Sequence, residues 1–218
     1  MKKRLERALL AAGRAALAAN VAAVLAHNAP ARAATPVAML SRFSPNMTTG
    51  ARTAVPTGYL QFCAQHPADC GAHAGQGGRV ALTQADLAQL RKVNDDINGR
   101  IAPMTDLEHY GEIERWTYPD DGYGDCEDYV LLKRRTLVGL GWPVDTLLVT
   151  VVRDRKGDGH AVLTVVTDRG DLVLDNQQTA IMLWHETGYR FVKRQAQENA
   201  DGWVSLGDVL APNTVGRN

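Results

Sequence analysis

The chain has 218 residues, with 24 basic side chains, 24 acidic side chains and three cysteines. Its hydrophobic fraction of 45% and charged fraction of 22% are ordinary globular values, so whole-chain disorder, a collagen helix and a coiled coil are not expected. The zero net charge hides an asymmetry. Residues 1–33 hold six basic side chains and one acidic side chain, which leaves 18 basic against 23 acidic, a net charge of −5, in the remainder. Composition therefore does not favour a nucleic-acid partner.

The first 33 residues have the layout of a secretory signal peptide. Basic residues (Lys2-Lys3-Arg4) precede an Ala/Leu-rich stretch from Ala8 to Ala26, and Ala31-Arg32-Ala33 offers a small-x-small cleavage site. Residues 1–33 are therefore predicted to direct export, with the mature protein starting after Ala33. The alternatives are an Arg-bearing amphipathic helix that is retained on a cytoplasmic protein and a membrane anchor. A spanning helix is disfavoured, because Arg14 interrupts the apolar run.

Residues 34–80 are expected to form an extended N-terminal arm and a loop that contains Cys63 and Cys70. These cysteines flank a short segment with Pro67, which an exported chain would close as a disulfide. Two free thiols are the alternative, and the spacing does not suit a zinc site. Pairing them leaves Cys126 alone, and an unpaired cysteine in an oxidising compartment suggests a reactive thiol.

Two helices are predicted in the middle of the chain. The first starts at Thr83, with Asp86 as its capping-box partner, and ends near Gly99. Residues 102–124 are expected to be irregular. The second helix is predicted from Cys126 to Leu140. The first helix should bury Leu87, Leu90, Val93 or Asn94, and Ile97; the second should bury Val130, Leu131, Leu137 and Val138, with Arg134 partly packed and Lys133-Arg134-Arg135 forming a solvated face.

Short alternating runs of β-branched residues follow and predict antiparallel strands. They cover Leu147–Arg153, His160–Thr167, Asp171–Asp175 and Tyr189–Arg194, separated by turn-forming residues. Because helices precede strands, the predicted class is α+β, with one domain over residues 81–218 and its central helix packed on a small antiparallel sheet.

Three residues lie where catalytic chemistry could use them. Cys126 opens a helix, whose N-terminal dipole favours a thiolate. His160 begins a strand and Asp175 ends the next, so neighbouring strands could bring them together. A thiol, an imidazole that takes its proton and a carboxylate that orients the imidazole form a catalytic triad. Each residue alone has a structural explanation: a small buried cysteine, a histidine beside a turn and an aspartate in a turn.

The segments Gly122–Tyr129, Gly159–Leu163 and Leu174–Asn176 resemble the bacterial transglutaminase-like cysteine peptidases, among them the LapG-type periplasmic proteases that release biofilm adhesins. The resemblance runs from about Ile101 to Arg194. Trp116 and the segment 189–195 are also typical of the family. It implies a papain-like, transglutaminase-like fold and a triad of Cys126, His160 and Asp175.

The acidic residues around Cys126 have two interpretations. They could cap the helix and complement its dipole. The resemblance implies instead that they bind calcium, because LapG-type proteases are calcium-dependent. Asp125 and Glu127 are the principal candidate ligands, and Asp128 and Asp106 the weaker ones. Calcium is thus the candidate cofactor, and no organic cofactor is expected.

The sequence and the resemblance together predict a periplasmic cysteine peptidase that acts through an acyl-enzyme. The expected partners are a protein substrate, with a surface adhesin as one candidate, and a membrane receptor or inhibitor that controls the enzyme. Acyl transfer to an amine, as in a transglutaminase or a deamidase, shares the same triad and remains an alternative. A non-catalytic periplasmic binding module with this fold is the other.

Overall fold

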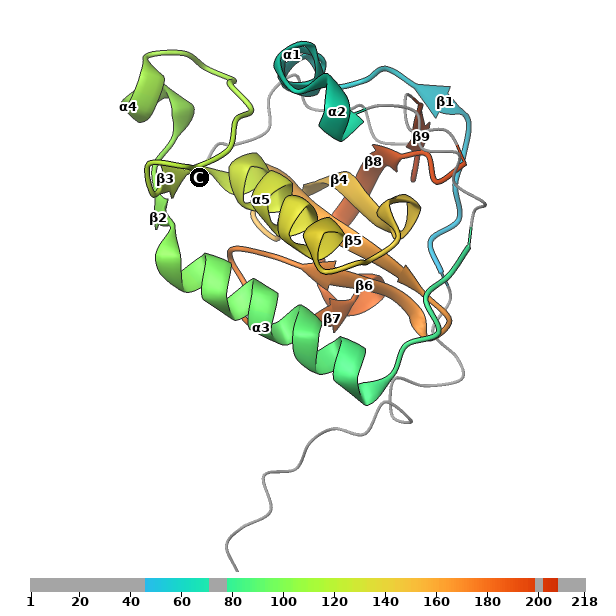
Figure 1. Cartoon of the computed structure of the whole chain (residues 1–218). Coiled ribbons are helices and arrows are strands. Elements are labelled where there is room, and N and C mark those ends of the chain that lie inside the picture. The colour runs from blue at the N-terminus through green and yellow to red at the C-terminus, as the bar shows by residue number, and fades with distance from the viewer. Residues whose placement is uncertain (1–45, 71–77, 199–201, 208–218) are drawn as a thin grey trace, which may run out of the picture. The chain divides into compact units, whose positions relative to one another are not determined.

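The computed structural model describes residues 46–70, 78–198 and 202–207 (Figure 1). The expected signal peptide (1–33), the first part of the predicted arm and residues 71–77 of the predicted loop lie outside these residues. Within them, no helix is long and apolar enough to cross a membrane. The helices are α1 (Thr57–Gln65), α2 (Pro67–Cys70), α3 (Gln84–Arg100), α4 (Asp106–Tyr110) and α5 (Cys126–Gly139), with 3₁₀ turns at Val144–Thr146 and Trp184–Glu186.

The described residues form one sheet of seven antiparallel strands in the order β1-β9-β8-β4-β5-β6-β7. A second, two-stranded sheet pairs β2 with β3 in parallel. The strands are β1 (Arg52–Thr53), β2 (Ala102–Pro103), β3 (Tyr123–Gly124), β4 (Leu147–Arg153), β5 (Gly159–Thr167), β6 (Gly170–Leu174), β7 (Met182–Leu183), β8 (Arg190–Gln195) and β9 (Trp203–Ser205).

The four predicted strands are β4, β5, β6 and β8, and their bounds agree with the structure to within a residue or so. The short strands β1, β7 and β9 were not predicted. Each has two or three residues, too few to show an alternating pattern. The strands β7 and β9 pair with the longer strands β6 and β8, and β1 pairs in turn with β9, which joins segments about 150 residues apart.

Alternating side chains give the sheet two covered faces. Val151 and Leu163 belong to the main core, which includes residues of α3 and α5. Val152 and Val162 belong to a smaller cluster with Phe191. This alternation follows from the period of two along a strand. Figure 1 shows α5 crossing the sheet over β4 and β5 with α3 beside it.

The helix α3 confirms its predicted start. The side chain of Thr83 accepts from the backbone N–H of Asp86, and Asp86 accepts from the backbone N–H of Thr83. The reciprocal bonds satisfy two donors that a helix N-terminus otherwise leaves open. Its buried residues are the predicted ones: Leu87, Leu90, Val93, Asn94 and Ile97.

The helix α5 begins at the predicted residue, but its buried face differs from the prediction. Lys133 is buried rather than solvated. Arg134 is partly packed, as predicted, and donates to the carbonyl oxygens of Leu147 and Asp69. Val138, expected in the core, is exposed. The reason is the helical period. Cys126, Val130, Lys133 and Leu137 follow one another at intervals of three or four residues, so the stripe that faces the sheet passes through Lys133.

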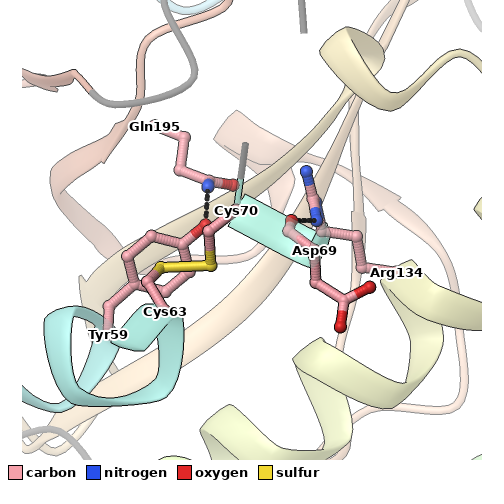
Figure 2. The surroundings of a disulfide bond; sticks show 6 residues. All are labelled: Tyr59, Cys63, Asp69, Cys70, Arg134 and Gln195. Carbon is pink, nitrogen blue, oxygen red and sulfur yellow. Dashed lines mark hydrogen bonds between the residues drawn. A yellow bond between two sulfur atoms is a disulfide. The ribbon is translucent and has the colours of Figure 1, made fainter. Parts of the chain in front are cut away.

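The segment between Cys63 and Cys70 is helical, where the sequence suggested a loop. It forms the end of α1 and all of α2, and the predicted disulfide joins the two helices (Figure 2). Tyr59 and Phe62 of α1 lie in the main core. A Cβ on Gly58 would lie 2.2 Å from the Trp116 ring, so the glycine permits this close approach. The nine-residue helix was missed because it has no side-chain cap.

The α1–α2 pair contacts the sheet and the helix α5 through two hydrogen bonds drawn in Figure 2. Gln195 of β8 donates to the hydroxyl of Tyr59 at 2.6 Å, and Arg134 of α5 donates to the carbonyl oxygen of Asp69 at 3.1 Å. The disulfide therefore closes a hairpin whose two helices are each tied to the rest of the fold.

Candidate functional site

Cys126 is the first residue of α5 and is 0% exposed. The backbone N–H of Ala161 at the start of β5 donates to its sulfur at 3.3 Å, and its thiol donates to Oε2 of Glu127 at 3.1 Å. The sulfur thus lies where the N-terminus of the helix meets the first residues of the strand. Cys126 is the one cysteine among the described residues that forms no disulfide.

His160 and Asp175 lie in contact, as the sequence suggested. Nε2 of His160 is 2.8 Å from Oδ1 of Asp175, and both side chains are buried. The register of β5 and β6 pairs Leu163 with Leu174, which places Asp175 two positions from the residue directly opposite His160, a diagonal neighbour on the same face. Nδ1 of His160 is buried and has no hydrogen-bond partner among the described residues. It is the ring nitrogen left to accept a proton, and His160 is adjacent to Ala161, whose N–H binds the Cys126 sulfur.

Two further donors hold the Asp175 carboxylate. The hydroxyl of Tyr189 donates to Oδ2 at 2.6 Å, and the backbone N–H of Gln177 donates to Oδ1 at 2.9 Å. Burial raises the pKa of Asp175, but the hydrogen bond and charge of His160, together with the bonds from Tyr189 and Gln177, outweigh it and hold the pKa below its usual range. Asp175 is therefore an ionised acceptor that can orient the imidazole.

Tyr189 was predicted only as the start of a strand and as part of a segment typical of the family, without a role in the site. Its ring meets the His160 ring edge to face, with 5.8 Å between the ring centroids. It lies just before β8, and its role follows from the sheet order rather than from any local motif.

Three carboxylates meet beside Cys126. Asp106, Asp125 and Glu127 are all buried and offer ligand oxygens within 4.8 Å of one another. Asp106 comes from the first turn of α4, and the other two flank the cysteine at the start of α5. Asp128, also a candidate by sequence, is not in this group. Its Oδ1 accepts from the backbone N–H of Thr117.

The position of Asp106 has a local sequence signal, a capping box at the start of α4. Thr105 and Glu108 form a capping box that starts α4 within the segment expected to be irregular. Asp106 also accepts a hydrogen bond from the backbone N–H of Arg115, which closes the following loop over it.

The pKa values of these acids show how strongly the site disfavours negative charge. Burial and the neighbouring carboxylates raise the pKa of Asp125 to about 7 and raise that of Glu127 well above its usual range. Burial also raises the pKa of Asp106. Burial, then the charges of Glu127 and Asp125, raise the pKa of the Cys126 thiol. Without an added positive charge, the acids therefore oppose a thiolate at Cys126.

The donor set fits a hard divalent cation. Oδ1 of Asp125 and Oε1 of Glu127 are buried and find no hydrogen-bond partner among the described residues. Asp125 occupies the N-cap position of α5 but makes no side-chain capping bond, so capping does not account for its carboxylate. Carboxylate oxygens are the hard ligands that calcium prefers, and here two of the buried oxygens have no donor.

Comparison with known proteins gives one family match. A family model described as bacterial transglutaminase-like cysteine proteinase BTLCP matches residues 49–210. Legionella pneumophila LapG has a similar solved structure, 28% identical, with a TM-score of 0.46 over 56% of this chain and 70% of that chain. Its calcium-bound structure is 27% identical, with a TM-score of 0.48 over 60% and 75% of the chains. An EGTA-treated structure is 26% identical, with a TM-score of 0.47 over 57% and 70%. No curated protein sequence matches this chain.

Proposed function

The chain belongs to the bacterial transglutaminase-like cysteine proteinases. We propose that it hydrolyses peptide bonds of a protein substrate through Cys126, His160 and Asp175. The observation that carries the proposal is the geometry of the three residues. Nε2 of His160 is hydrogen-bonded to Oδ1 of Asp175 at 2.8 Å, and Nδ1 has no partner among the described residues. The backbone N–H of Ala161, the residue after His160, donates to the Cys126 sulfur.

Each residue then has one role in the reaction. The thiol of Cys126 gives its proton to Nδ1 of His160, and the sulfur attacks the peptide carbonyl carbon. His160 returns the proton to the leaving amine, and water, activated by the same imidazole, releases the acyl group from the sulfur. Asp175 holds the imidazole in the tautomer whose Nδ1 accepts. The backbone N–H of Cys126, at the open N-terminus of α5, can donate to the oxyanion.

We further propose that Asp106, Asp125 and Glu127 hold a calcium ion. The bound ion would supply positive charge that offsets the three carboxylates. The proposal is supported by their convergence, their burial and the two oxygens that lack donors. Their charge lies next to Cys126, so the occupancy of this group bears on whether the thiol can lose its proton.

Calcium should stabilise the folded protein measurably. A ligand at 100 times its Kd adds about 2.7 kcal/mol to the free energy of unfolding, which corresponds to a rise in Tm of roughly 5–10 °C for a domain of this size. The measurement is thermal unfolding of the wild-type protein in calcium and in excess EGTA. Peptidase activity should be lost in EGTA and return with calcium.

Two variants make the calcium experiment specific. Asp125→Asn removes a charged ligand and should abolish the rise in Tm. Asp128→Asn is the matched control, because Asp128 is adjacent in sequence but lies outside the group, and an amide oxygen can still accept from Thr117. An equal response to calcium in wild type and Asp125→Asn would place the ion elsewhere.

The products of the reaction distinguish hydrolysis from acyl transfer. The wild-type protein is incubated in calcium with an unfolded protein substrate and a labelled primary amine, and the products are analysed by mass spectrometry. Hydrolysis should produce new peptide amino-termini that are absent with Cys126→Ala. Incorporation of the amine at glutamine side chains without backbone cleavage would contradict the peptidase proposal and favour the transglutaminase alternative, because both share the acyl-enzyme.

We also propose that the protein acts in the periplasm on a cell-surface or periplasmic protein, such as an adhesin. The disulfide between Cys63 and Cys70 supports an oxidising compartment, and the layout of residues 1–33 supports export.

A further inference from the structure

The turn between β4 and β5 leads directly into His160 and is held by its own hydrogen bonds. Asp154 is buried, and its Oδ1 accepts from the backbone N–H groups of Lys156 at 2.8 Å and Asp158 at 3.0 Å. The backbone N–H of Asp154 also donates to the carbonyl oxygen of Asp158 at 2.9 Å. This internally bonded turn therefore presents Arg155 from a well-defined backbone, five residues before His160.

Arg155 reaches from this turn to the segment that precedes β8. Its Nε donates to the carbonyl oxygen of Thr187 at 2.9 Å. Its side chain also lies across Gly188, where an added Cβ would be 3.2 Å from Nε. The φ of Gly188 is +75°, a conformation that favours glycine. Two segments that are 32 residues apart in the chain therefore meet at this contact.

The segment that Arg155 contacts carries Tyr189. The hydroxyl of Thr187 donates to the carbonyl oxygen of Trp184 at 2.7 Å and accepts from the backbone N–H of Tyr189 at 3.1 Å. All three residues belong to the segment, so these bonds shape its turn. The bond from Arg155 attaches the turn to the β4–β5 hairpin, which carries His160.

Tyr189 connects this segment to the proposed triad. Its hydroxyl donates to Oδ2 of Asp175 at 2.6 Å, and its ring meets the His160 ring edge to face. Gly188 lies between the backbone that Arg155 holds and Tyr189. Because a glycine has no side chain that restricts its backbone, a bond beside it limits how far the following residue can move. The contact from Arg155 is placed to do this.

We propose that Arg155 is a positioning residue for the peptidase reaction: by holding the backbone at Thr187 and Gly188, it keeps the hydroxyl of Tyr189 on the Asp175 carboxylate. The inference rests on the proposed function, because it assumes that Asp175 orients the imidazole. Arg155 acts through Tyr189 and does not touch the substrate or the reacting atoms.

The variant Arg155→Met tests this role, because methionine keeps an unbranched side chain but cannot donate. We expect kcat to fall about fivefold, the loss that one hydrogen bond supports, and KM to change less than about twofold. Tm should stay within about 2 °C of the wild-type value, since the side chain is exposed. Lys156→Met is the matched control and should leave kcat unchanged. It removes the same charge from the same turn, and among the described residues Lys156 contributes only its backbone N–H to the hydrogen bonds of that turn.

A double-mutant cycle with Tyr189→Phe separates positioning from a general structural role. Once the Tyr189 hydroxyl is absent, Arg155→Met should change kcat less than about twofold, because the group that Arg155 positions is gone. A residue that only stabilises the fold would lower kcat by the same factor in both backgrounds. Equal falls in the two backgrounds, a fall with Lys156→Met as large as that with Arg155→Met, or no fall with Arg155→Met would each overturn the inference.

Failure of the proposed function has a different signature. The wild type would then show no hydrolysis that depends on Cys126. The same cycle is in that case measured on the rate at which iodoacetamide labels Cys126, because this reaction needs the thiol and imidazole but no protein substrate. Slower labelling with Arg155→Met that disappears in the Tyr189→Phe background would support the positioning role. Identical labelling rates in wild type and Arg155→Met would overturn it by itself.

Discussion

Cys126→Ala is expected to lower the rate of peptide hydrolysis about a million-fold, the loss found when the nucleophile of a triad is removed. In the proposed reaction the sulfur is the atom that bonds to the acyl group, and no other free cysteine lies among the described residues to replace it. The fold should persist, because alanine loses only one buried sulfur and leaves the start of α5 unchanged. The assay is substrate cleavage in calcium, with Tm as the measure of folding.

The same variant can identify the substrate. Cells that carry Cys126→Ala should retain, in their surface and periplasmic fractions, the proteins that wild-type cells cleave, and quantitative proteomics of these fractions would reveal them. Cys126→Ser is the second variant, since it restores a hydrogen-bond donor towards Glu127 but not the thiol. Activity of Cys126→Ala above one hundredth of the wild-type rate would contradict its assignment as the nucleophile.

Asp175→Asn has the next largest expected effect, a fall in kcat of about 10⁴-fold. An amide keeps one acceptor oxygen and gains two donors, while Asp175 accepts from His160, Gln177 and Tyr189. If the amide nitrogen faces His160, the ring takes the tautomer with the proton on Nδ1 and can no longer accept from the thiol. If the oxygen faces His160, the negative charge that stabilises the imidazolium is still lost.

Tyr189→Phe is the matched control for Asp175→Asn. It removes one donor to the same carboxylate but keeps the charge, and a hydrogen bond to a charged group contributes about 1.5–3 kcal/mol. Its effect on kcat should therefore be smaller than that of Asp175→Asn by at least tenfold. If Asp175→Asn retained a tenth of the wild-type kcat with KM unchanged, the carboxylate would not be orienting the imidazole.

The elements predicted from the sequence are those with local signals. The capping box at Thr83 and the alternating run over Leu147–Arg153 each involve residues close in the chain, and both elements appear with the expected start. The helix α1 and the strands β1 and β9 lack such signals. The helix α1 packs on the main core, β9 pairs with the edge of β8, and β1 pairs with β9, so all three depend on contacts with segments distant in the chain.

The sequence by itself determined which chemical groups are present and how each is presented: a thiol at the start of a helix, a histidine at the start of a strand and an aspartate after the next strand. Only the tertiary structure decided which of them meet. Asp106 joins Asp125 and Glu127 while Asp128 turns to Thr117, because α4 and the loop after it return to the N-terminus of α5. The prediction that Lys133 faces solvent was wrong because the buried face of a helix depends on the elements that pack against it. For α5 these elements are the sheet and α3, and Lys133 is buried.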